Sequence, residues 1–150
     1  MSDRIIKVYV DTNVLINYCT GQKKDIEAIR HLSSKRSKRL LFTSSLAVVQ
    51  TISKLQSKGK GGRQAFSREK TIKKLGEILP KFTVLNLTYP DIEDGFKLLN
   101  SNDIEDCVHY VISQKMKCGA IVTNNKKDFT KFQDIEVFGT DLDVLKTEIQ

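Results

Sequence analysis

The stretch Ile5–Tyr18, IIKVYVDTNVLINY, sets a run of apolar and β-branched residues directly before Asp, Thr and Asn. Ile5–Val10 is hydrophobic almost throughout, which is typical of a strand covered on both faces of a parallel sheet. Apolar residues at helical spacing follow in Asn13–Cys19 and predict a short helix. A buried strand that leads straight into a helix is the pattern expected at the start of an α/β domain.

Similar runs recur along the chain and alternate with helical patterns. Further strands are expected at Leu40–Thr43, Phe82–Leu87, Ala120–Thr123 and Ile135–Gly139. A helix is expected at about Asp25–Ser34, and a second helix should follow a cap at Ser44 or Ser45. A third helix should end at Pro80. A fourth should begin at Tyr89 with Pro90 in its first turn, and a fifth should follow a cap at Asp103. This alternation predicts right-handed crossovers and a mainly parallel sheet of about five strands. We therefore expect one three-layer α/β/α domain over residues 1–150.

Apolar residues three and four positions apart mark the faces that we expect the helices to bury. The expected faces are Ile26, Ile29 and Leu32; Leu46, Val49 and Ile52; Ile72, Leu75 and Leu79; Ile92, Phe96 and Leu99; and Ile104, Val108, Val111 and Ile112. Between two of these helices, SKGKGGRQ (57–64) carries three glycines among basic residues and predicts a flexible connection.

Composition narrows the class of protein. The 150 residues are 39% hydrophobic and 29% charged, as in ordinary globular domains. No segment approaches the roughly eighteen apolar residues of a membrane span, and Met1–Asp11 lacks a signal-peptide pattern, so we expect a cytoplasmic or nucleoid-associated protein without a membrane segment. Cys19, Cys107 and Cys118 are far apart, and only two histidines are present, so we expect free thiols and no zinc site.

The net charge of +7 is concentrated in two segments. Arg30–Arg39 holds five Lys or Arg residues and no acid, and Lys54–Lys74 holds eight against one Glu. Such segments suit a polyanionic partner, although a lysine-rich face that is merely solvated fits as well. Phe66 is expected to pack inward and not to stack on a base. The candidate phosphate contacts are Lys54, Lys58, Lys60, Arg63 and Arg68, with Lys70, Lys73 and Lys74 beside them.

Polar residues gather where predicted strands end, which is where ligands bind in parallel sheets. They are Asp11, Thr12 and Asn13 after the first strand, Thr123, Asn124, Asn125 and Asp128 after the fourth, and Asp103, Glu105 and Asp106 at the start of the helix between. We expect Asp11, Asp106 and Asp128 to converge at one edge. Carboxylates that converge repel one another unless a cation offsets their charge, and hard oxygen ligands favour Mg²⁺ or Mn²⁺.

Each acid also has a purely structural interpretation. Asp11 could cap the helix that follows it, and Asp106 lies three residues after Asp103, the spacing of a capping box. Asp128 could cap a short helix that runs into Phe129. The three acids together favour a metal site over three unrelated caps.

Four stretches, VYVDTNVLINY, LLFTSSLAVVQ, DIEDCVHYVISQKMKCGAIVTNNKKDF and IEVFGTDLDVL, resemble the PIN domain in that order across nearly the whole chain. The resemblance implies an α/β/α fold and a Mg²⁺- or Mn²⁺-dependent ribonuclease, and many small members are toxins of bacterial toxin–antitoxin pairs. It assigns Asp11, Asp106 and Asp128 as catalytic and metal-binding acids. It also implies auxiliary roles for Thr12, Asn13, Thr123, Asn125 and Glu105, with Asp103 in reserve.

The chain departs from the family at Gln50, where an acid, often Glu, is usual. An amide has no charge and cannot act as a base, so we expect weaker metal binding or a single bound ion. Some bacterial subgroups with the same SSL helix also lack this acid. The alternative is a weakened module that binds RNA or a protein partner without cleavage. A haloacid-dehalogenase-type phosphatase fits poorly, because it needs a second acid where this chain has Asn13.

The sequence as a whole favours an endoribonuclease whose metal lowers the pKa of a bound water. That water would attack the phosphodiester in line and leave a 5′-phosphate and a 3′-hydroxyl, as the family's chemistry implies. The expected partners are RNA, a cognate antitoxin protein and a second copy of the chain.

Overall fold

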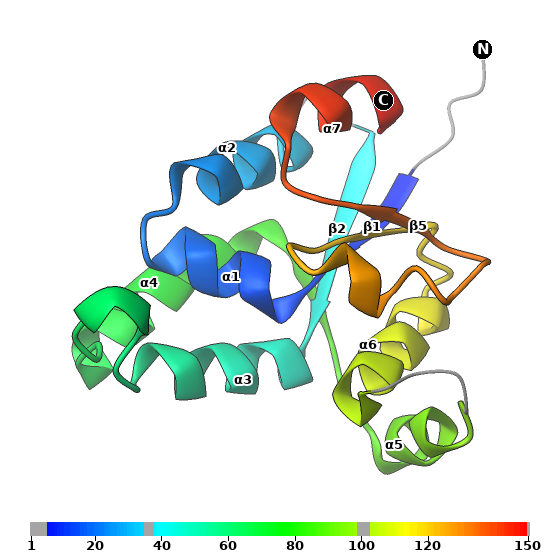
Figure 1. Ribbon diagram of the computed structural model, residues 1–150, viewed down its shortest axis with the longest axis horizontal. Coiled ribbons are helices and arrows are strands. Elements are labelled where there is room, and N and C mark those ends of the chain that lie inside the picture. The colour runs from blue at the N-terminus through cyan, green and yellow to red at the C-terminus, as the bar shows by residue number, and fades with distance from the viewer. Residues whose placement is uncertain (1–5, 35–37, 99–102, 150) are drawn as a thin grey trace.

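A central sheet of five parallel strands organises the protein. The computed structural model describes residues 6–34, 38–98 and 103–149. The strands are β1 (Ile6–Val10), β2 (Arg39–Ser44), β3 (Thr83–Leu85), β4 (Ala120–Val122) and β5 (Glu136–Phe138). Their order across the sheet is β3-β2-β1-β4-β5, and every neighbouring pair is parallel, as predicted (Figure 1). Ile5 and Leu99, which we assigned to a strand and a helix face, lie outside the described residues.

Helices fill the connections between the strands. They are α1 (Thr12–Cys19), α2 (Lys23–Leu32), α3 (Ser45–Leu55), α4 (Arg68–Ile78), α5 (Tyr89–Phe96), α6 (Ile104–Lys115) and α7 (Leu142–Glu148), with 3₁₀ turns η1 (Lys60–Gly62), η2 (Leu79–Lys81) and η3 (Lys126–Asp128). The predicted starts are confirmed at α3 and α6, where the side chains of Ser44 and Asp103 accept from Ala47 N and Glu105 N. Pro90 occupies the first turn of α5, which Thr88 caps.

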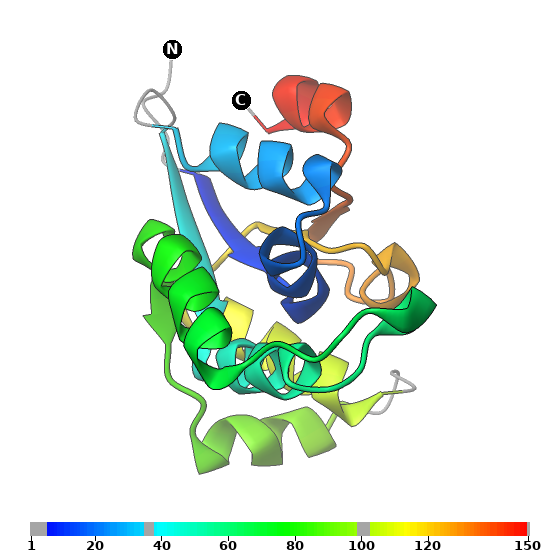
Figure 2. The ribbon, with the colours of Figure 1, turned by 90° about the vertical axis from the view of Figure 1, so that its left-hand side faces the viewer.

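Side chains on the two faces of the sheet build two apolar cores. Val8 and Val10 pack with residues of α1, α2, α3, α4 and α7, whereas Tyr9 points to the opposite face and packs with α6. This alternation is the two-residue period of a strand, and it confirms the predicted three layers. α5 lies outside α6, at the lower edge of Figures 1 and 2. A Cβ on Gly95 would come within 2.8 Å of Val108 Cγ2, so glycine permits this close helix contact.

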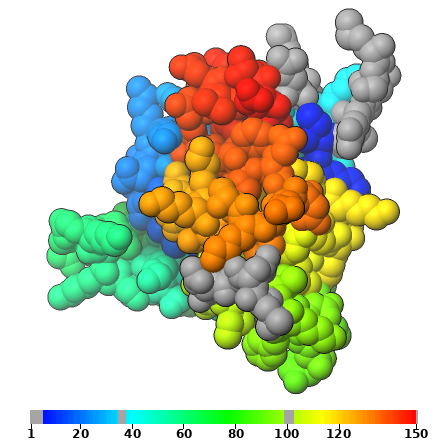
Figure 3. Space-filling view, turned by 45° about the vertical axis from the view of Figure 1, so that its right-hand side comes forward, coloured from blue at the N-terminus to red at the C-terminus, as the bar shows by residue number. Residues whose placement is uncertain are grey.

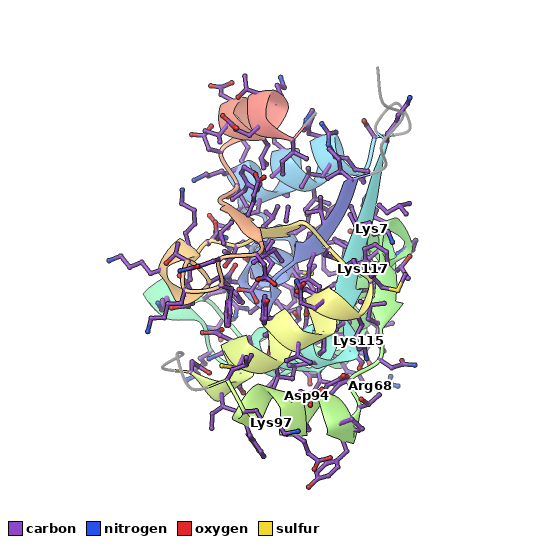
Figure 4. All side chains as sticks on the ribbon, turned by 90° about the vertical axis from the view of Figure 1, so that its right-hand side faces the viewer. Lys7, Arg68, Asp94, Lys97, Lys115 and Lys117 are labelled. Atoms are coloured by element: carbon purple, nitrogen blue, oxygen red, sulfur yellow. The ribbon has the colours of Figure 1, made fainter. Side chains whose placement is uncertain are left out.

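An ion pair joins Lys115 at the end of α6, labelled in Figure 4, to Asp91 in the first turn of α5. Lys115 Nζ lies 2.8 Å from Asp91 Oδ2 and 2.7 Å from the carbonyl oxygen of Asn86. Burial raises the pKa of Asp91, but the hydrogen bonds from Lys115 and Thr88 outweigh it, so the pKa lies below its usual value.

The predicted buried face of α3 is wrong at Val49, whereas Ile52 and Leu46 pack partly buried against the two cores. Ala47, Thr51 and Leu55 are buried, whereas Val49 is 63% exposed and Leu46 is only half-buried. The helix packs against α1, and small side chains such as Ala47 and Thr51 allow the two helices to approach closely. Val49 therefore points away from the core, whereas Leu55 is fully buried.

Three other residues that we expected inside are exposed. Ile72 of α4, Phe96 of α5 and Ile104 of α6 are 55, 57 and 59% exposed. In α6 the buried face consists of Cys107, Val108 and Ile112 with two polar residues. Ile104 is the first residue of α6 and is exposed because it precedes the turn that contacts the sheet.

One expectation from composition agrees with the structure. The cysteines Cys19, Cys107 and Cys118 are free and buried. No helix in the described residues is both long enough and apolar enough to cross a membrane.

Candidate active site

A cleft of about 800 Å³ opens where β1 and β4 end. These neighbouring strands flank the point at which the chain switches from one half of the sheet to the other, where parallel sheets bind ligands. It is lined by the starts of α1 and α6, by one side of α3 from Leu46 to Lys54, and by the turn η3. Of the predicted site residues, the cleft is lined by Asp11, Thr12, Asn13, Gln50, Lys54, Asp103, Glu105, Asp106, Asn125 and Asp128.

Asp11 is the most firmly held acid of the cleft. It caps α1, because Oδ1 accepts from the backbone N–H of Thr12 at 2.8 Å. Oδ2 accepts from the Thr123 hydroxyl at 2.9 Å and from Asn13 Nδ2 at 3.1 Å. The capping interpretation is therefore correct for Asp11, but the cap occupies only one oxygen and the carboxylate also faces the cleft.

The neighbours of Asp11 are themselves fixed. Thr123 is fully buried and its oxygen accepts from the backbone N–H of Asn125. Asn13 Oδ1 accepts from Asn124 N, and Asn124 Nδ2 donates to the buried carboxylate of Asp25 at 2.8 Å. The loop after β4 is thus attached to α1 and α2 by a continuous hydrogen-bond network, which limits how far Asp11 can move.

Asp106 and Asp128 form the opposite wall, and neither acts as a cap. The cap of α6 is Asp103, and Asp128 ends η3, whose cap position is Asn125. Burial, followed by the nearby charges of Asp103, Asp128, Asp11 and Glu105, raises the pKa of Asp106 to about 7. The carboxylates therefore repel one another across the cleft.

The donor set of the cleft suits a hard divalent cation, because it consists of carboxylate, amide and hydroxyl oxygens. The arrangement is not closed, however. Within residues 6–34, 38–98 and 103–149, no group of three or more His, Cys, Asp or Glu side chains is close enough together to hold a metal ion. A cation shared by Asp11, Asp106 and Asp128 therefore requires the side chains to rotate toward one another.

His109 belongs to the cleft and was missed in the sequence. It is buried on α6, and Nε2 lies 2.8 Å from Gln50 Oε1 and 3.9 Å from Asp11 Oδ1. Its Nδ1 lies 2.6 Å from the hydroxyl of Tyr9. Burial lowers the pKa of His109 against the opposing effect of Asp11. The available signal was spacing: His109 follows Asp106 by three residues, which places both on one face of a helix.

The side chain of Gln50, which belongs to α3, connects α1 and α6 through hydrogen bonds. Its Oε1 accepts from the Thr12 hydroxyl at 2.6 Å as well as from His109. The residue that replaces the usual acid of the family is thus part of a hydrogen-bond network and not an isolated substitution.

The basic residues separate into two groups. Lys54 lines the cleft, whereas Lys58, Lys60 and Arg68 are exposed on or beside the segment that projects from the body in Figure 3. Arg63 has a structural function: its guanidinium donates to the carbonyl oxygens of Lys54, Ser57 and Gln64. Lys35 and Arg36 of the other basic segment lie outside the described residues.

Phe66 packs inward as expected. It is half-buried against the core, and the side chains of Arg63 and Lys70 lie over its ring at 5.2 and 4.1 Å from the centroid. Among the other lysines, Lys74 pairs with Glu77 along α4.

Comparisons with known proteins agree with this architecture. A family model described as "PIN domain" matches residues 8–135. The chain is 30% identical over 145 residues to a protein named Ribonuclease VapC1 from Aquifex aeolicus, covering 90% of this chain and 91% of that protein.

Solved structures share the fold. VapBC2 from Rickettsia felis, bound to a DNA fragment from its promoter, has a TM-score of 0.65 at 14% identity, covering 89% of this chain and 98% of that chain. Mycobacterium tuberculosis VapC20, described as a sarcin–ricin loop cleaving toxin, has a TM-score of 0.61 at 17% identity. The match covers 87% of this chain and 98% of that chain. The motifs at the strand ends, the parallel sheet and these matches agree, and the chain belongs to the PIN-domain family.

Proposed function

We propose that this protein is a metal-dependent endoribonuclease and the toxin of a toxin–antitoxin pair. The observation that carries the proposal is that Asp11, Asp106 and Asp128, from three distant segments, line one cleft in which Asp106 has a raised pKa. An acid whose pKa is raised by burial and by neighbouring carboxylates favours a bound cation, and a perturbed carboxylate in a cleft is typical of functional sites. The relative named as a ribonuclease supports the choice of reaction.

In this proposal Asp11, Asp106 and Asp128 hold Mg²⁺ or Mn²⁺. Such an ion, when bound, lowers the pKa of a coordinated water and stabilises negative charge on a phosphoryl group. Thr123 and Asn13 keep the Asp11 carboxylate in one orientation through their hydrogen bonds to Oδ2. Lys54 lines the cleft and would position a phosphate of the RNA backbone. Lys58, Lys60 and Arg68 would extend this contact outward, whereas Arg63 would act only on the structure of the segment.

A cognate antitoxin is the proposed protein partner. The support is that VapBC2 of Rickettsia felis and a VapBC complex of Salmonella typhimurium share the fold of this chain. Cytoplasmic location and homodimer formation stay predictions from the sequence.

Single-stranded RNA incubated with Mn²⁺, with and without EDTA, tests the proposal. Wild type should cleave the RNA only with Mn²⁺, and an Asp11→Asn, Asp128→Asn double variant should not cleave it. Equal cleavage by both proteins, or cleavage that survives EDTA, would contradict the mechanism. A folded wild type that binds RNA but leaves it intact would favour the alternative, a non-cleaving module, which Gln50 at the position of the usual acid motivates.

A further inference from the structure

Gln50 and His109 belong to a buried chain of hydrogen bonds that crosses the protein from β2 to the cleft. Ser44 Oγ lies 2.8 Å from the hydroxyl of Tyr9, and that hydroxyl lies 2.6 Å from His109 Nδ1. His109 Nε2 in turn lies 2.8 Å from Gln50 Oε1. Ser44, Tyr9 and His109 are all buried, so each polar atom requires a partner within the protein.

One pattern of donors satisfies every member of this chain. Neutral histidine carries a proton on one ring nitrogen and accepts on the other. The buried Ser44 hydroxyl has the Tyr9 oxygen as its acceptor, so the Tyr9 hydroxyl donates to Nδ1 and the proton of His109 lies on Nε2, which faces Gln50. The Ser44 hydroxyl then donates to the Tyr9 oxygen, while Ser44 Oγ accepts from the backbone N–H of Ala47. Burial, the largest influence on Tyr9, raises the pKa of its phenol and keeps it a donor.

The consequence for Gln50 is a fixed amide. Its carbonyl oxygen has two lone pairs, and the two donors, the Thr12 hydroxyl and His109 Nε2–H, occupy both. Rotation of the amide by 180° would turn an NH₂ group toward His109 Nε2–H, placing two donors face to face. In the part of the chain that the structure describes, no hydrogen bond reaches Gln50 Nε2, and Gln50 lines the cleft. The NH₂ group is therefore what residue 50 offers to a ligand.

We propose that His109 is a positioning residue that fixes Gln50 with its NH₂ group toward the cleft, where it donates to a phosphate oxygen of the substrate and does not coordinate the metal. An amide can bind Mg²⁺ or Mn²⁺ only through its oxygen, which is already occupied twice. Residue 50 thus changes from the family's usual acid to a substrate contact. This inference rests on the proposed function for the identity of the substrate, but the orientation of the amide does not.

Substitution of Gln50 separates the two roles. Gln50→Met keeps the length of the side chain and removes the donor, so KM for single-stranded RNA should rise roughly five- to tenfold with kcat within about twofold. The Kd for Mn²⁺, measured by calorimetry, should stay within about twofold of wild type. Gln50→Glu should tighten Mn²⁺ binding and raise KM, because it adds a ligand and removes a donor. Gln56→Met, at the exposed end of the same helix, is the matched control and should change neither quantity.

Two substitutions of His109 test its positioning role. Gln can place an NH₂ donor near the position of Nε2, whereas Asn reproduces only the position of Nδ1. His109→Asn should therefore raise KM as Gln50→Met does, and His109→Gln should restore it to within about threefold of wild type. Equal losses in both variants, parallel to losses in melting temperature, would indicate a merely structural histidine and overturn the proposal.

The tautomer of His109 gives a readout that needs no activity. Nitrogen-15 spectra of the wild type should show a proton on Nε2, and a proton on Nδ1 would overturn the proposed orientation. A fivefold or greater loss of Mn²⁺ affinity in Gln50→Met would also overturn it, since Gln50 would then be a metal ligand. If wild type fails to cleave RNA, the proposed function fails, while the tautomer and the Mn²⁺ titrations still decide how Gln50 is held.

Discussion

The two walls of the cleft differ in how their acids are supported. On the wall formed by β1, β4 and α1, Asp11 is buried and accepts three hydrogen bonds within a network that includes Thr123 and Asn13. On the wall formed by α6 and η3, Asp106 is half-buried and Asp128 is exposed. No hydrogen bond to either carboxylate is found in the described ranges, from 6 to 149 with their two gaps.

The difference indicates that one wall is preorganised and the other adjustable. A carboxylate fixed by neighbouring donors presents its lone pairs in a constant direction, which favours metal binding. Carboxylates without donors can rotate toward a cation, at the cost of mutual repulsion when no cation is present. This division is consistent with a donor set that suits Mg²⁺ or Mn²⁺ but is not closed in the structure.

The largest expected effect is the loss of the preorganised acid. We expect Asp11→Asn to weaken Mn²⁺ binding and RNA cleavage at least about 100-fold, because it removes a charge from the preorganised acid of the proposed metal site. Asp128→Asn should cost less, roughly tenfold, since its neighbours can rotate to replace it. Calorimetric titration with Mn²⁺ and initial cleavage rates measure both. A greater loss in Asp128→Asn than in Asp11→Asn would reverse our assignment of the two walls.

A hydrogen bond to Asp11 can be removed while the charge of Asp11 is kept. Thr123→Val deletes the hydroxyl that donates to Asp11, and we expect a 10- to 100-fold loss of Mn²⁺ affinity, with a loss of about 1–3 kcal/mol in the free energy of unfolding. Thr51→Val is the matched control, because Thr51 is equally buried but donates only to the Ala47 carbonyl within α3. If the two variants bind Mn²⁺ alike, the hydrogen bond to Asp11 has no influence on the metal.

The acids of the adjustable wall should make the free energy of unfolding depend on pH. In the folded protein the pKa of Asp106 is raised from 3.8 to about 7, so the folded state holds this proton more tightly than the unfolded chain. In EDTA the contribution of Asp106 to stability should be complete below about pH 4 and disappear as pH rises through 7. Because the side chain is half-buried and solvent screens it, we expect on the order of 1–2 kcal/mol.

Urea unfolding at pH 5 and pH 8, in wild type and Asp106→Asn, measures this contribution. Asp106→Asn should flatten the pH dependence. In wild type, affinity for Mn²⁺ should increase from pH 6 to pH 8, since the cation competes with the proton. A wild type whose stability does not fall over this range would show that the acids do not repel one another.

The smallest expected effect is the loss of Lys54, a basic side chain that lines the cleft. Lys54→Met should weaken RNA binding about two- to fivefold at low salt and reduce the slope of log K against log salt by about one, as expected when one phosphate contact is lost. Lys58→Met, on the projecting segment, should have a smaller effect. Fluorescence anisotropy over a salt series distinguishes them, and an unchanged slope in Lys54→Met would remove Lys54 from the site.

The sequence predicted the sheet and the strand-end residues well, because both depend on short-range rules. Ile6–Val10 is a nearly continuous apolar run, and such runs have few alternatives to a buried parallel strand. Asp11 and Asp128 line the same cleft because the carboxyl ends of parallel strands meet at one edge of the sheet.

What the sequence did not predict depends on contacts between distant segments. Val49 and Ile104 have helical spacing but face solvent, because periodicity identifies an apolar face without saying which element covers it. His109 was missed because a single histidine in a sequence does not indicate a site. Its role depends on Tyr9 and Gln50, which only the fold places beside it. Arg63 was assigned to RNA for its charge, and only the fold shows that its guanidinium is occupied by carbonyl oxygens.

The guanidinium of Arg63 has a thermodynamic consequence for the projecting basic segment. It donates hydrogen bonds to carbonyl oxygens at the end of α3. It also passes so close to Gly59 that a Cβ there would lie 2.3 Å from Nε. These contacts order the loop in the absence of a ligand. A lysine-bearing loop that is already ordered loses little conformational entropy when it meets a polyanion. Gly59 leaves room for the Arg63 guanidinium, and Gly61 and Gly62 have positive φ, so these glycines permit a compact turn that carries the neighbouring lysines.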